Sequence, residues 1–187
     1  MKKVYSKKLK QHLKSYKIAS RRKSTLNHAF ASALAPYDEY DEAKANEAIT
    51  LLGQNPEGDI TCFYCGKEMS TWDHIHAIVK DTDFSGYGHQ IRNLVPSCRD
   101  CNSKKGNEEV DTFIDNRDII SDKELKKRII KDYTAPLAKS LNSNGLREKY
   151  PVEMREYDRI KKEIFDLIDR ADEVANIIRI KEKQRIN

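Results

Sequence analysis

Apolar side chains in the first fifty residues recur at intervals of three and four, which is typical of amphipathic helices. The pattern predicts one helix from about residue 6 to residue 35, and the polar run at 20–24 is where a break is expected. Pro36 ends this helix because proline cannot continue one. A second helix is predicted over 41–52, since Asp41 can accept hydrogen bonds from its first amides and Gly53 follows its last turn.

The middle of the chain alternates short apolar runs with turn residues, which is typical of strands joined by loops. Pro96 places the later strand at a sheet edge or at a strand end, because proline cannot donate to a sheet. In chain order, the pattern predicts a strand at 60–67, a strand at 71–79, a loop at 80–91, a strand at 93–97 and a short helix at 99–105.

The last third is predicted to be helical, with short helices at 110–115 and 122–133 and a long helix at 152–184. Apolar residues of the long helix follow alternating spacings of three and four from Tyr157 to Ile178. This stripe can pack within the chain or against a second copy, as in a coiled coil, and the sequence leaves both open. We therefore expect a basic helical region at 1–58, a compact middle at 59–107 and a helical region at 108–187.

The charge distribution points to a polyanionic partner. Charged residues make up 35% of the chain and hydrophobic residues 38%, and residues 1–37 hold ten lysines and arginines but no aspartate or glutamate. Such a basic arm binds phosphate backbones by releasing counterions, although a merely solvated terminus has the same composition. We see no secretory signal and no apolar run of about 18 residues, so we expect a cytoplasmic protein without a membrane partner.

All four cysteines of the chain lie in two Cys-x-x-Cys pairs, at Cys62 and Cys65 and at Cys98 and Cys101. Each such pair supplies two thiolates from one turn, and four thiolates fill the tetrahedral shell of a structural zinc ion. The pairs are 32 residues apart, farther than in a simple zinc ribbon, so the stretch between them is expected to be a functional insert. Because the shell would be complete, this zinc is expected to be structural, and a redox dithiol is the alternative.

Asp73 and His74 lie between the cysteine pairs and carry the side chains that phosphodiester hydrolysis needs. An imidazole such as that of His74 can take a proton from water near neutral pH. A hard cation such as Mg²⁺ binds carboxylate and amide oxygens, which Asp73 and Asn102 offer. Asp73 and His74 point to opposite faces of a regular strand, so both can serve one site only if the strand twists or bulges at its end.

These motifs, in this order, resemble the HNH endonucleases that carry a zinc site. The resemblance rests on Asp73-His74-Ile75, on Asn93-Leu94-Val95-Pro96 and on the run from Cys98 to Gly106, and it covers about a quarter of the chain. It implies a ββα-metal motif, in which a hairpin and a helix hold one divalent cation. It further implies that His74 is the general base, that Asp73 and Asn102 ligate a catalytic Mg²⁺ or Mn²⁺ ion, and that Asn93 braces the loop and orients the histidine. The final position is often histidine in the family, so this chain is an H-N-N variant.

Other side chains near these motifs have less specific roles. His76 shares a face with His74 and is the alternative base, and His89 is either a packed loop residue or a substrate contact. Trp72 is expected to pack beneath the hairpin rather than to stack on a base. The basic side chains expected to contact a nucleic-acid substrate are Arg21, Arg22, Lys23, Arg99, Lys104 and Lys105.

Together these features predict an α+β, mostly helical protein with a central HNH zinc module and helical extensions on both sides. The expected activity is metal-dependent hydrolysis of DNA phosphodiester bonds, with structural zinc and catalytic Mg²⁺ or Mn²⁺ as cofactors. Duplex DNA is the expected partner, a homodimer is one option, and restriction or phage defence is an expectation by analogy. A non-catalytic zinc protein that binds nucleic acid and an RNA-directed HNH nuclease are the alternatives.

Overall fold

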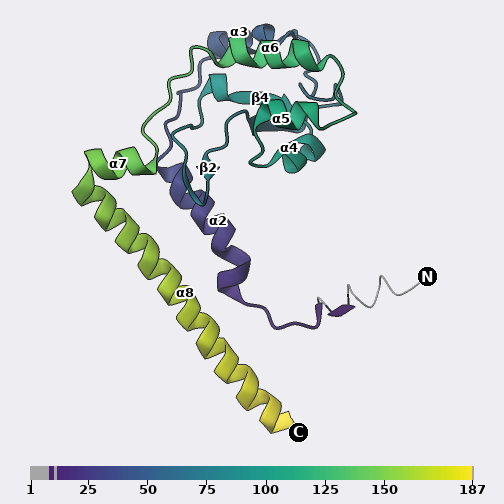
Figure 1. The fold of residues 1–187 in the computed structure, drawn as a ribbon. Coiled ribbons are helices and arrows are strands. Elements are labelled where there is room, and N and C mark those ends of the chain that lie inside the picture. Colours follow the sequence, from purple (N-terminus) through teal and green to yellow (C-terminus); the bar gives the residue numbers. More distant parts are fainter. Residues whose placement is uncertain (1–8, 11, 187) are drawn as a thin grey trace. The chain divides into compact units, whose positions relative to one another are not determined.

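The computed structural model describes residues 9–10 and 12–186. Two compact units divide the chain: one combines the residues up to Leu26 with those from Val152 onward, and the other runs from Asn27 to Pro151. Most of the described chain is helical and the strands are confined to its middle, which confirms the predicted fold class (Figure 1). The division into three regions stays a prediction. None of the helices in the described residues combines the length and the apolar content that a bilayer crossing needs.

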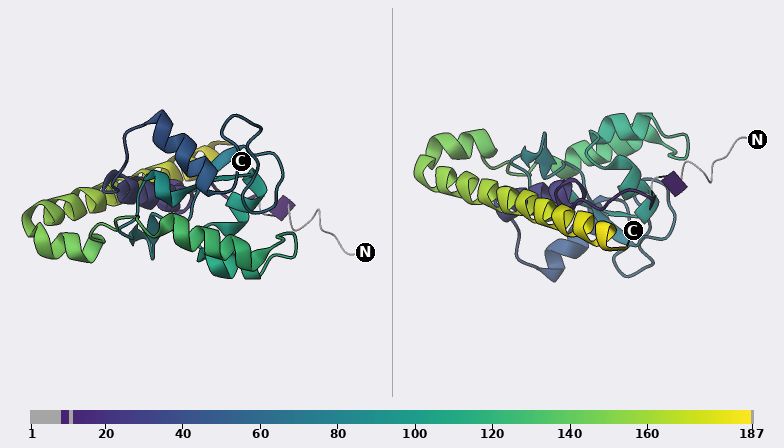
Figure 2. Two further views of the ribbon diagram at one scale, coloured as in Figure 1. Left: turned by 90° about the horizontal axis from the view of Figure 1, so that it is seen from above. Right: turned by 90° about the horizontal axis from the view of Figure 1, so that it is seen from below.

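The first unit contains most of α8 (Pro151–Ile186) and the beginning of α2 (Ile18–Ala33). The long helix predicted at 152–184 is confirmed, and Figure 2 shows it as one uninterrupted helix. The amides of Ile18 and Ala19 donate to the carboxylate of Asp172 at 2.8 and 3.0 Å. Asp172 therefore supplies acceptors that the first turn of α2 lacks. Apolar side chains of the predicted stripe that stay exposed on α8 include Ile160, Leu167, Val174 and Ile178.

The break predicted near 20–24 is wrong, because α2 runs through these residues without interruption. The hydroxyl of Ser20 donates to the carbonyl oxygen of Lys17 at 3.2 Å, so it does not compete for amides inside the helix. The chain is non-helical at 14–17 instead. The predicted start of this helix, near residue 6, lies outside the described residues.

Two small antiparallel sheets lie in the second unit. Strand β1 (Thr71–His74) pairs with β4 (Leu94–Ser97), and β2 (Val79–Lys80) pairs with β3 (Asp83–Phe84). The strand predicted at 93–97 is confirmed, with a single 3-10 turn, η1 (Ile91–Asn93), leading into it. The strand predicted at 71–79 is too long, since β1 ends at His74, and the predicted loop at 80–91 contains β3.

The strand predicted at 60–67 is wrong: this segment is a tight turn with one bridge, between Thr61 and Glu68. The amide of Cys62 donates to the carbonyl oxygen of Lys67 at 2.7 Å, and the amide of Gly66 donates to the carbonyl oxygen of Cys62 at 2.8 Å. Gly66 has a φ of 74°, a left-handed conformation that glycine adopts without strain. The backbone groups that a strand would offer to a sheet are therefore bonded within the turn.

Helices surround these sheets, and the predicted helices of the second unit are confirmed. They are α3 (Glu42–Leu51), α4 (Arg99–Lys105), α5 (Val110–Asp115) and α6 (Lys123–Thr134), and α7 (Ser143–Lys149) is additional. Asp41 caps α3 as predicted, because its carboxylate accepts a hydrogen bond from the amide of Lys44 at 3.0 Å.

The main core of the second unit lies between the cysteine turn, β4 and the helices α3, α5 and α6. Its most buried large side chains include Phe63, Tyr64, Val95, Phe113, Ile114 and Tyr133. A smaller cluster joins the second hairpin to the end of α2 through Ala31, Ile78, Val79 and Phe84. The hairpin of β1 and β4 is thus fixed on the larger core, and the loop that follows β1 is fixed on the smaller one.

Candidate active site and metal centre

The four cysteines converge on one point, as their spacing predicts. Their sulfur atoms all lie within 4.8 Å of one another, and the Sγ atoms of Cys65 and Cys98 are 3.8 Å apart. A tetrahedral zinc site with Zn–S bonds of about 2.3 Å places its sulfurs roughly 3.8 Å apart. All four cysteines are free thiols. The cluster therefore has the donors and the dimensions of a four-thiolate zinc site.

The cysteine cluster ties the turn at its start to the strand and the helix at its end. The amide of Phe63 donates to the carbonyl oxygen of Pro96 in β4 at 2.8 Å. Cys98 is the N-cap residue of α4, and its sulfur accepts from the amide of Cys101 at 3.5 Å. A cation bound there would hold the end of β4 and the start of α4 against the turn.

His74 lies at the end of β1, where its imidazole meets that of His89. Nε2 of His74 is 3.1 Å from Nδ1 of His89, and among the described residues Nδ1 of His74 has no hydrogen-bond partner. Burial, followed by the charges of His89, Lys105 and His28, lowers the pKa of His74 to about 4. The ring is therefore uncharged near neutral pH, and it can accept a proton at Nδ1 when its own hydrogen is on Nε2.

Asn93 is fully buried and holds two loops together. Its Oδ1 accepts from the amide of His76 at 2.8 Å, and its Nδ2 donates to the carbonyl oxygens of His76 and Gly88 at 3.0 and 2.9 Å. The amide of Ile75 adds a bond to the carbonyl oxygen of Asn93 at 2.8 Å. These contacts fix the backbone of Ile75 and His76, which directly follow His74. The role of Asn93 in orienting the base stays a prediction.

Asp73 alternates with His74 along β1, is buried, and contacts α4 through Lys105. Its Oδ2 accepts from the hydroxyl of Tyr64 at 2.7 Å and is 3.4 Å from Nζ of Lys105. Burial raises the pKa of Asp73, and the ammonium of Lys105 opposes that shift without cancelling it. Asp73 as a metal ligand stays a prediction.

Lys105 does not fit the surface role expected for it. Its side chain has no exposed area, and its ammonium donates to the carbonyl oxygen of His74 at 2.7 Å besides pairing with Asp73. Lys105 follows Cys101 by four residues on α4, so the helix turns both side chains to the same buried side. Lys105 therefore supports the end of β1 and does not reach the solvent.

Asn102 lies on α4 and faces β1. Its Nδ2 donates to the carbonyl oxygen of Trp72 at 3.2 Å and to Oγ1 of Thr71 at 3.4 Å, whereas Oδ1 has no partner among the described residues. Thr71 and Asp73 share a face of β1, because side chains alternate along a strand. The free oxygen of Asn102 and the carboxylate of Asp73 thus belong to the side of the strand that α4 covers.

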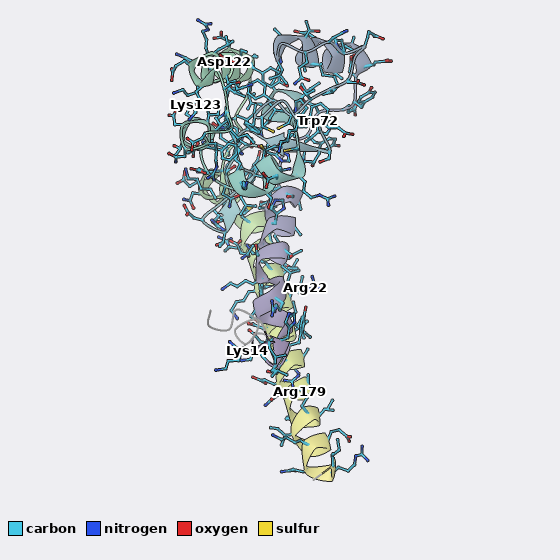
Figure 3. The ribbon with its side chains drawn as sticks, turned by 90° about the vertical axis from the view of Figure 1, so that its right-hand side faces the viewer. Lys14, Arg22, Trp72, Asp122, Lys123 and Arg179 are labelled. Atoms are coloured by element: carbon cyan, nitrogen blue, oxygen red, sulfur yellow. The ribbon has the colours of Figure 1, made fainter. Side chains whose placement is uncertain are left out.

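The remaining basic side chains expected to contact substrate are exposed. Arg21, Arg22 and Lys23 lie on α2, where Figure 3 labels Arg22, and Arg99 and Lys104 lie on α4. Their role in substrate binding stays a prediction.

The expectation that Trp72 packs beneath the hairpin is wrong, because its side chain is 45% exposed. The sheet of β1 and β4 has only two strands, and α4 covers the face that carries Thr71 and Asp73. Trp72 alternates with these two residues along β1 and so lies on the opposite face. The side chain is therefore available to a partner molecule.

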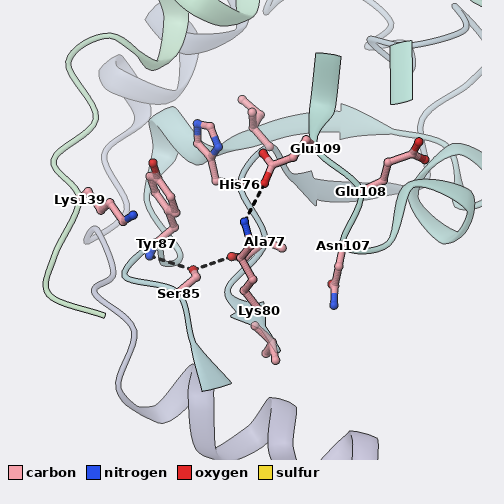
Figure 4. Close-up of a pocket in the computed structure, with 11 residues that line it drawn as sticks. His76, Ala77, Lys80, Ser85, Tyr87, Asn107, Glu108, Glu109 and Lys139 are labelled. Carbon is pink, nitrogen blue, oxygen red and sulfur yellow. Dashed lines mark hydrogen bonds and ion pairs between the residues drawn. The ribbon is translucent and has the colours of Figure 1, made fainter. Parts of the chain in front are cut away.

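A pocket of about 230 Å³ lies beside His76 (Figure 4). The ring of His76 stacks on that of Tyr87 with centroids 4.3 Å apart, and the ammonium of Lys139 lies 4.9 Å from the centroid of the Tyr87 ring. Lys80 and Glu109 form an ion pair at 3.2 Å along its wall. Stacking on Tyr87 orients the His76 ring but does not occupy its nitrogen atoms, so His76 stays the alternative to His74 as the base.

Two features of this site escaped the sequence-based prediction. The sequence allows either a packing role or a substrate contact for His89, and the structure pairs it with His74. Nothing local to His89 signals this, since it lies 15 residues from His74. Tyr64 and Lys105 form a buried network with Asp73, and the four-residue spacing from Cys101 to Lys105 was a signal for the second of these.

The hairpin of β1 and β4 followed by α4 has the order of a ββα-metal motif, with the cysteine cluster at its base. A comparison with family models agrees, since residues 62–108 match the model of the HNH endonuclease family. The chain therefore carries an HNH endonuclease domain over about a quarter of its length, and the resemblance noted in the sequence is confirmed. No curated protein matches the chain. No solved structure matches it either.

Proposed function

We propose that the HNH domain is a metal-dependent endonuclease that hydrolyses phosphodiester bonds of DNA, with His74 as the general base. The observation that supports this most is the state of the His74 ring. It is uncharged near neutral pH, is engaged at Nε2 by His89, and has a free Nδ1 among the described residues. An uncharged imidazole whose hydrogen is on Nε2 can take a proton from water at Nδ1.

In the proposed reaction, Nδ1 of His74 takes a proton from a water molecule beside the scissile phosphate. The water oxygen bonds to phosphorus while the bond from phosphorus to the 3′ oxygen breaks, and the 3′ oxygen takes a proton from solvent. The products are a 5′-phosphate and a 3′-hydroxyl. Removing a general base of this kind slows such a step by about 10²–10⁴-fold.

A Mg²⁺ or Mn²⁺ ion, when bound, would supply positive charge for the phosphoryl oxygens and the leaving oxygen. Asn102 fits such a cation because its nitrogen is engaged with β1 and its oxygen has no partner in the described part of the chain. Asp73 would be the second protein ligand, since it lies on the face of β1 that α4 covers. Measuring Mn²⁺ affinity tests this assignment: Asn102→Ala and Asp73→Asn should each weaken it by at least about tenfold.

We further propose that Cys62, Cys65, Cys98 and Cys101 bind zinc, and that this zinc is structural. All four thiolates would fill a tetrahedral shell, so no position would remain for water or substrate. The zinc would then stabilise the turn, β4 and α4, the helix that carries Asn102. Catalysis would depend on zinc only through the folding of the domain.

The proposed substrate is duplex DNA, held by exposed basic side chains on α2 and α4. Arg21, Arg22 and Lys23 form the densest cluster, and Arg99 and Lys104 flank Asn102 on α4.

Homodimerisation through the exposed apolar stripe of α8 is also proposed, because a single site cuts one strand and a duplex cut needs two. Gel filtration with light scattering tests it, and a monomer at micromolar concentration would exclude it.

The substrate assignment is tested by incubating the protein with plasmid DNA, single-stranded DNA and structured RNA, each with Mg²⁺ or Mn²⁺. We expect nicking or linearisation of the plasmid, with products that a ligase can reseal because they carry 5′-phosphates. Cleavage of RNA alone would favour an RNA-directed HNH nuclease instead.

A role in restriction or phage defence stays a prediction, and phage plating on cells with the wild-type chain or the His74→Ala variant tests it.

A further inference from the structure

The contact between His74 and His89 has the geometry of a hydrogen bond. Nε2 of His74 and Nδ1 of His89 are 3.1 Å apart, and the rings meet edge to face with centroids 5.1 Å apart and an angle of 70° between their planes. Two uncharged imidazoles at this distance must share one proton, since two lone pairs repel and two N–H groups clash. The pair therefore has one donor and one acceptor.

Only one of the two arrangements lets His74 act as a base. If His89 donates from Nδ1, the only lone pair of neutral His74 is used at Nε2, and its Nδ1 carries a hydrogen. If His74 donates from Nε2, its Nδ1 keeps a lone pair for the proton of the attacking water. In that second arrangement His89 carries its own hydrogen at Nε2, which lies on an exposed residue and can donate to solvent.

The backbone of His89 is fixed from one side by the segment that follows α2. Its amide donates to the carbonyl oxygen of Pro36 at 2.8 Å, and its carbonyl oxygen accepts from the amide of Asp38 at 3.1 Å. Gly88 makes this approach possible, because a Cβ atom at that position would lie 2.0 Å from the carbonyl oxygen of Pro36. The close contact therefore requires glycine immediately before His89.

The other side of His89 is fixed by Asn93. The carbonyl oxygen of Gly88 and both backbone groups of His76 bond to the same Asn93 side chain. One buried amide thus links the loop after His74 to the loop that carries His89. The backbone from which the His89 imidazole projects is consequently held by hydrogen bonds on both sides, although His89 itself is exposed.

We propose that His89 is a positioning residue that holds His74 as the Nε2–H tautomer, so that Nδ1 of His74 is free to take the proton of the attacking water. This role rests on the proposed function of His74 as general base. When Nδ1 takes the proton, His74 becomes an imidazolium with hydrogens on both nitrogens. Its bond from Nε2 to the lone pair of His89 then becomes charge-assisted and stronger, which stabilises the cation as it forms.

The test uses the full chain with zinc bound and compares His89→Ala with His89→Asn. The Oδ1 atom of asparagine can occupy nearly the place of Nδ1 and accept the same hydrogen bond, whereas alanine cannot. Nitrogen-15 NMR of the ring nitrogens at pH 7.5 reports the tautomer of His74, whose signals are assigned with the His74→Gln variant. We expect the Nε2–H tautomer in the wild type and in His89→Asn, and a mixture of both tautomers in His89→Ala.

Cleavage kinetics give the second readout. We expect His89→Ala to lower kcat by about 10- to 100-fold with KM changed less than about threefold, and His89→Asn to restore most of the loss. A residue that only packs would give equal defects in both variants, and a substrate contact would change KM instead. Either result overturns the proposal, as does an Nδ1–H tautomer of His74 in the wild type or an unchanged tautomer in His89→Ala.

The NMR result does not depend on activity. If the wild type cleaves no nucleic acid, the proposed function fails while the tautomer measurement still decides whether His89 sets the state of His74. Zinc content and the thermal unfolding midpoint, measured for each variant, separate loss of the hydrogen bond from loss of the fold.

Discussion

The buried pair of Lys105 and Asp73 gives the sharpest test of how the site is built. Replacing Lys105 with methionine keeps the length of the side chain but removes the ammonium that contacts Asp73 and the carbonyl oxygen of His74. The exposed fractions of the two side chains are 0% and 4%, so the remaining carboxylate would be left charged in a buried place. Breaking such a pair typically destabilises a protein by about 3–5 kcal/mol.

Lys104 provides the matched control, since it is the preceding residue on the same helix. Its ammonium pairs with Asp100 at 2.9 Å, but both side chains are more than half exposed. Surface pairs of this kind contribute about 0–1 kcal/mol. Lys104→Met should therefore leave the unfolding midpoint almost unchanged, whereas Lys105→Met should lower it by roughly 10 °C.

The assay is thermal and urea unfolding of the zinc-loaded protein, followed by circular dichroism. The double variant Asp73→Asn with Lys105→Met removes both charges and should be more stable than the sum of the single losses predicts, by about 1–3 kcal/mol. If Lys105→Met and Lys104→Met have the same unfolding free energy, or if the double variant is strictly additive, the buried pair is not what holds β1 to α4.

Three further predictions concern zinc, protonation and the basic arm. Removing the metal with a strong chelator, or replacing Cys98 with serine, should lower the unfolding midpoint sharply, because structural zinc contributes of order 10 kcal/mol to folding. An unchanged midpoint in protein without metal would contradict a structural role for zinc. The low pKa of His74 keeps it uncharged until the pH approaches about 4, so kcat/KM should stay nearly flat from about pH 7.5 down to about 5.5, and a decline centred near 6.5 would refute this. Replacing Arg21, Arg22 and Lys23 with glutamine should make the dependence of DNA affinity on salt shallower by about 2–3 units of log slope, and an identical slope would exclude these residues from the interface.

The helices and the cysteine cluster could be predicted because their signals are local. Asp41 and Gly53 mark the ends of α3 within the segment itself, and each Cys-x-x-Cys pair places two thiolates in one turn whatever surrounds it. The long helix α8 is similarly encoded by its own spacing of apolar residues. In these cases neighbouring residues determine the structure, so the sequence alone is sufficient.

The strands and the contacts of the site could not be predicted equally well, because they depend on distant residues. The segment at 60–67 has strand-forming residues, but its hydrogen bonds close inside the cysteine turn. Trp72 is exposed because α4 covers the other face of β1, which no local pattern reveals. The pairing of His74 with His89 depends on Asn93 and Pro36, which lie far apart in the chain.

The most direct test of the account is the cleavage rate of supercoiled plasmid by the wild type, by His74→Gln and by His12→Gln, each with Mg²⁺ or Mn²⁺ and with a chelator. His12 is an exposed histidine outside the HNH domain and serves as the matched control. The account predicts metal-dependent cleavage by the wild type and by His12→Gln at similar rates, and cleavage at least about 100-fold slower by His74→Gln. Equal rates for the wild type and for His74→Gln, with both proteins folded and loaded with zinc, would contradict it.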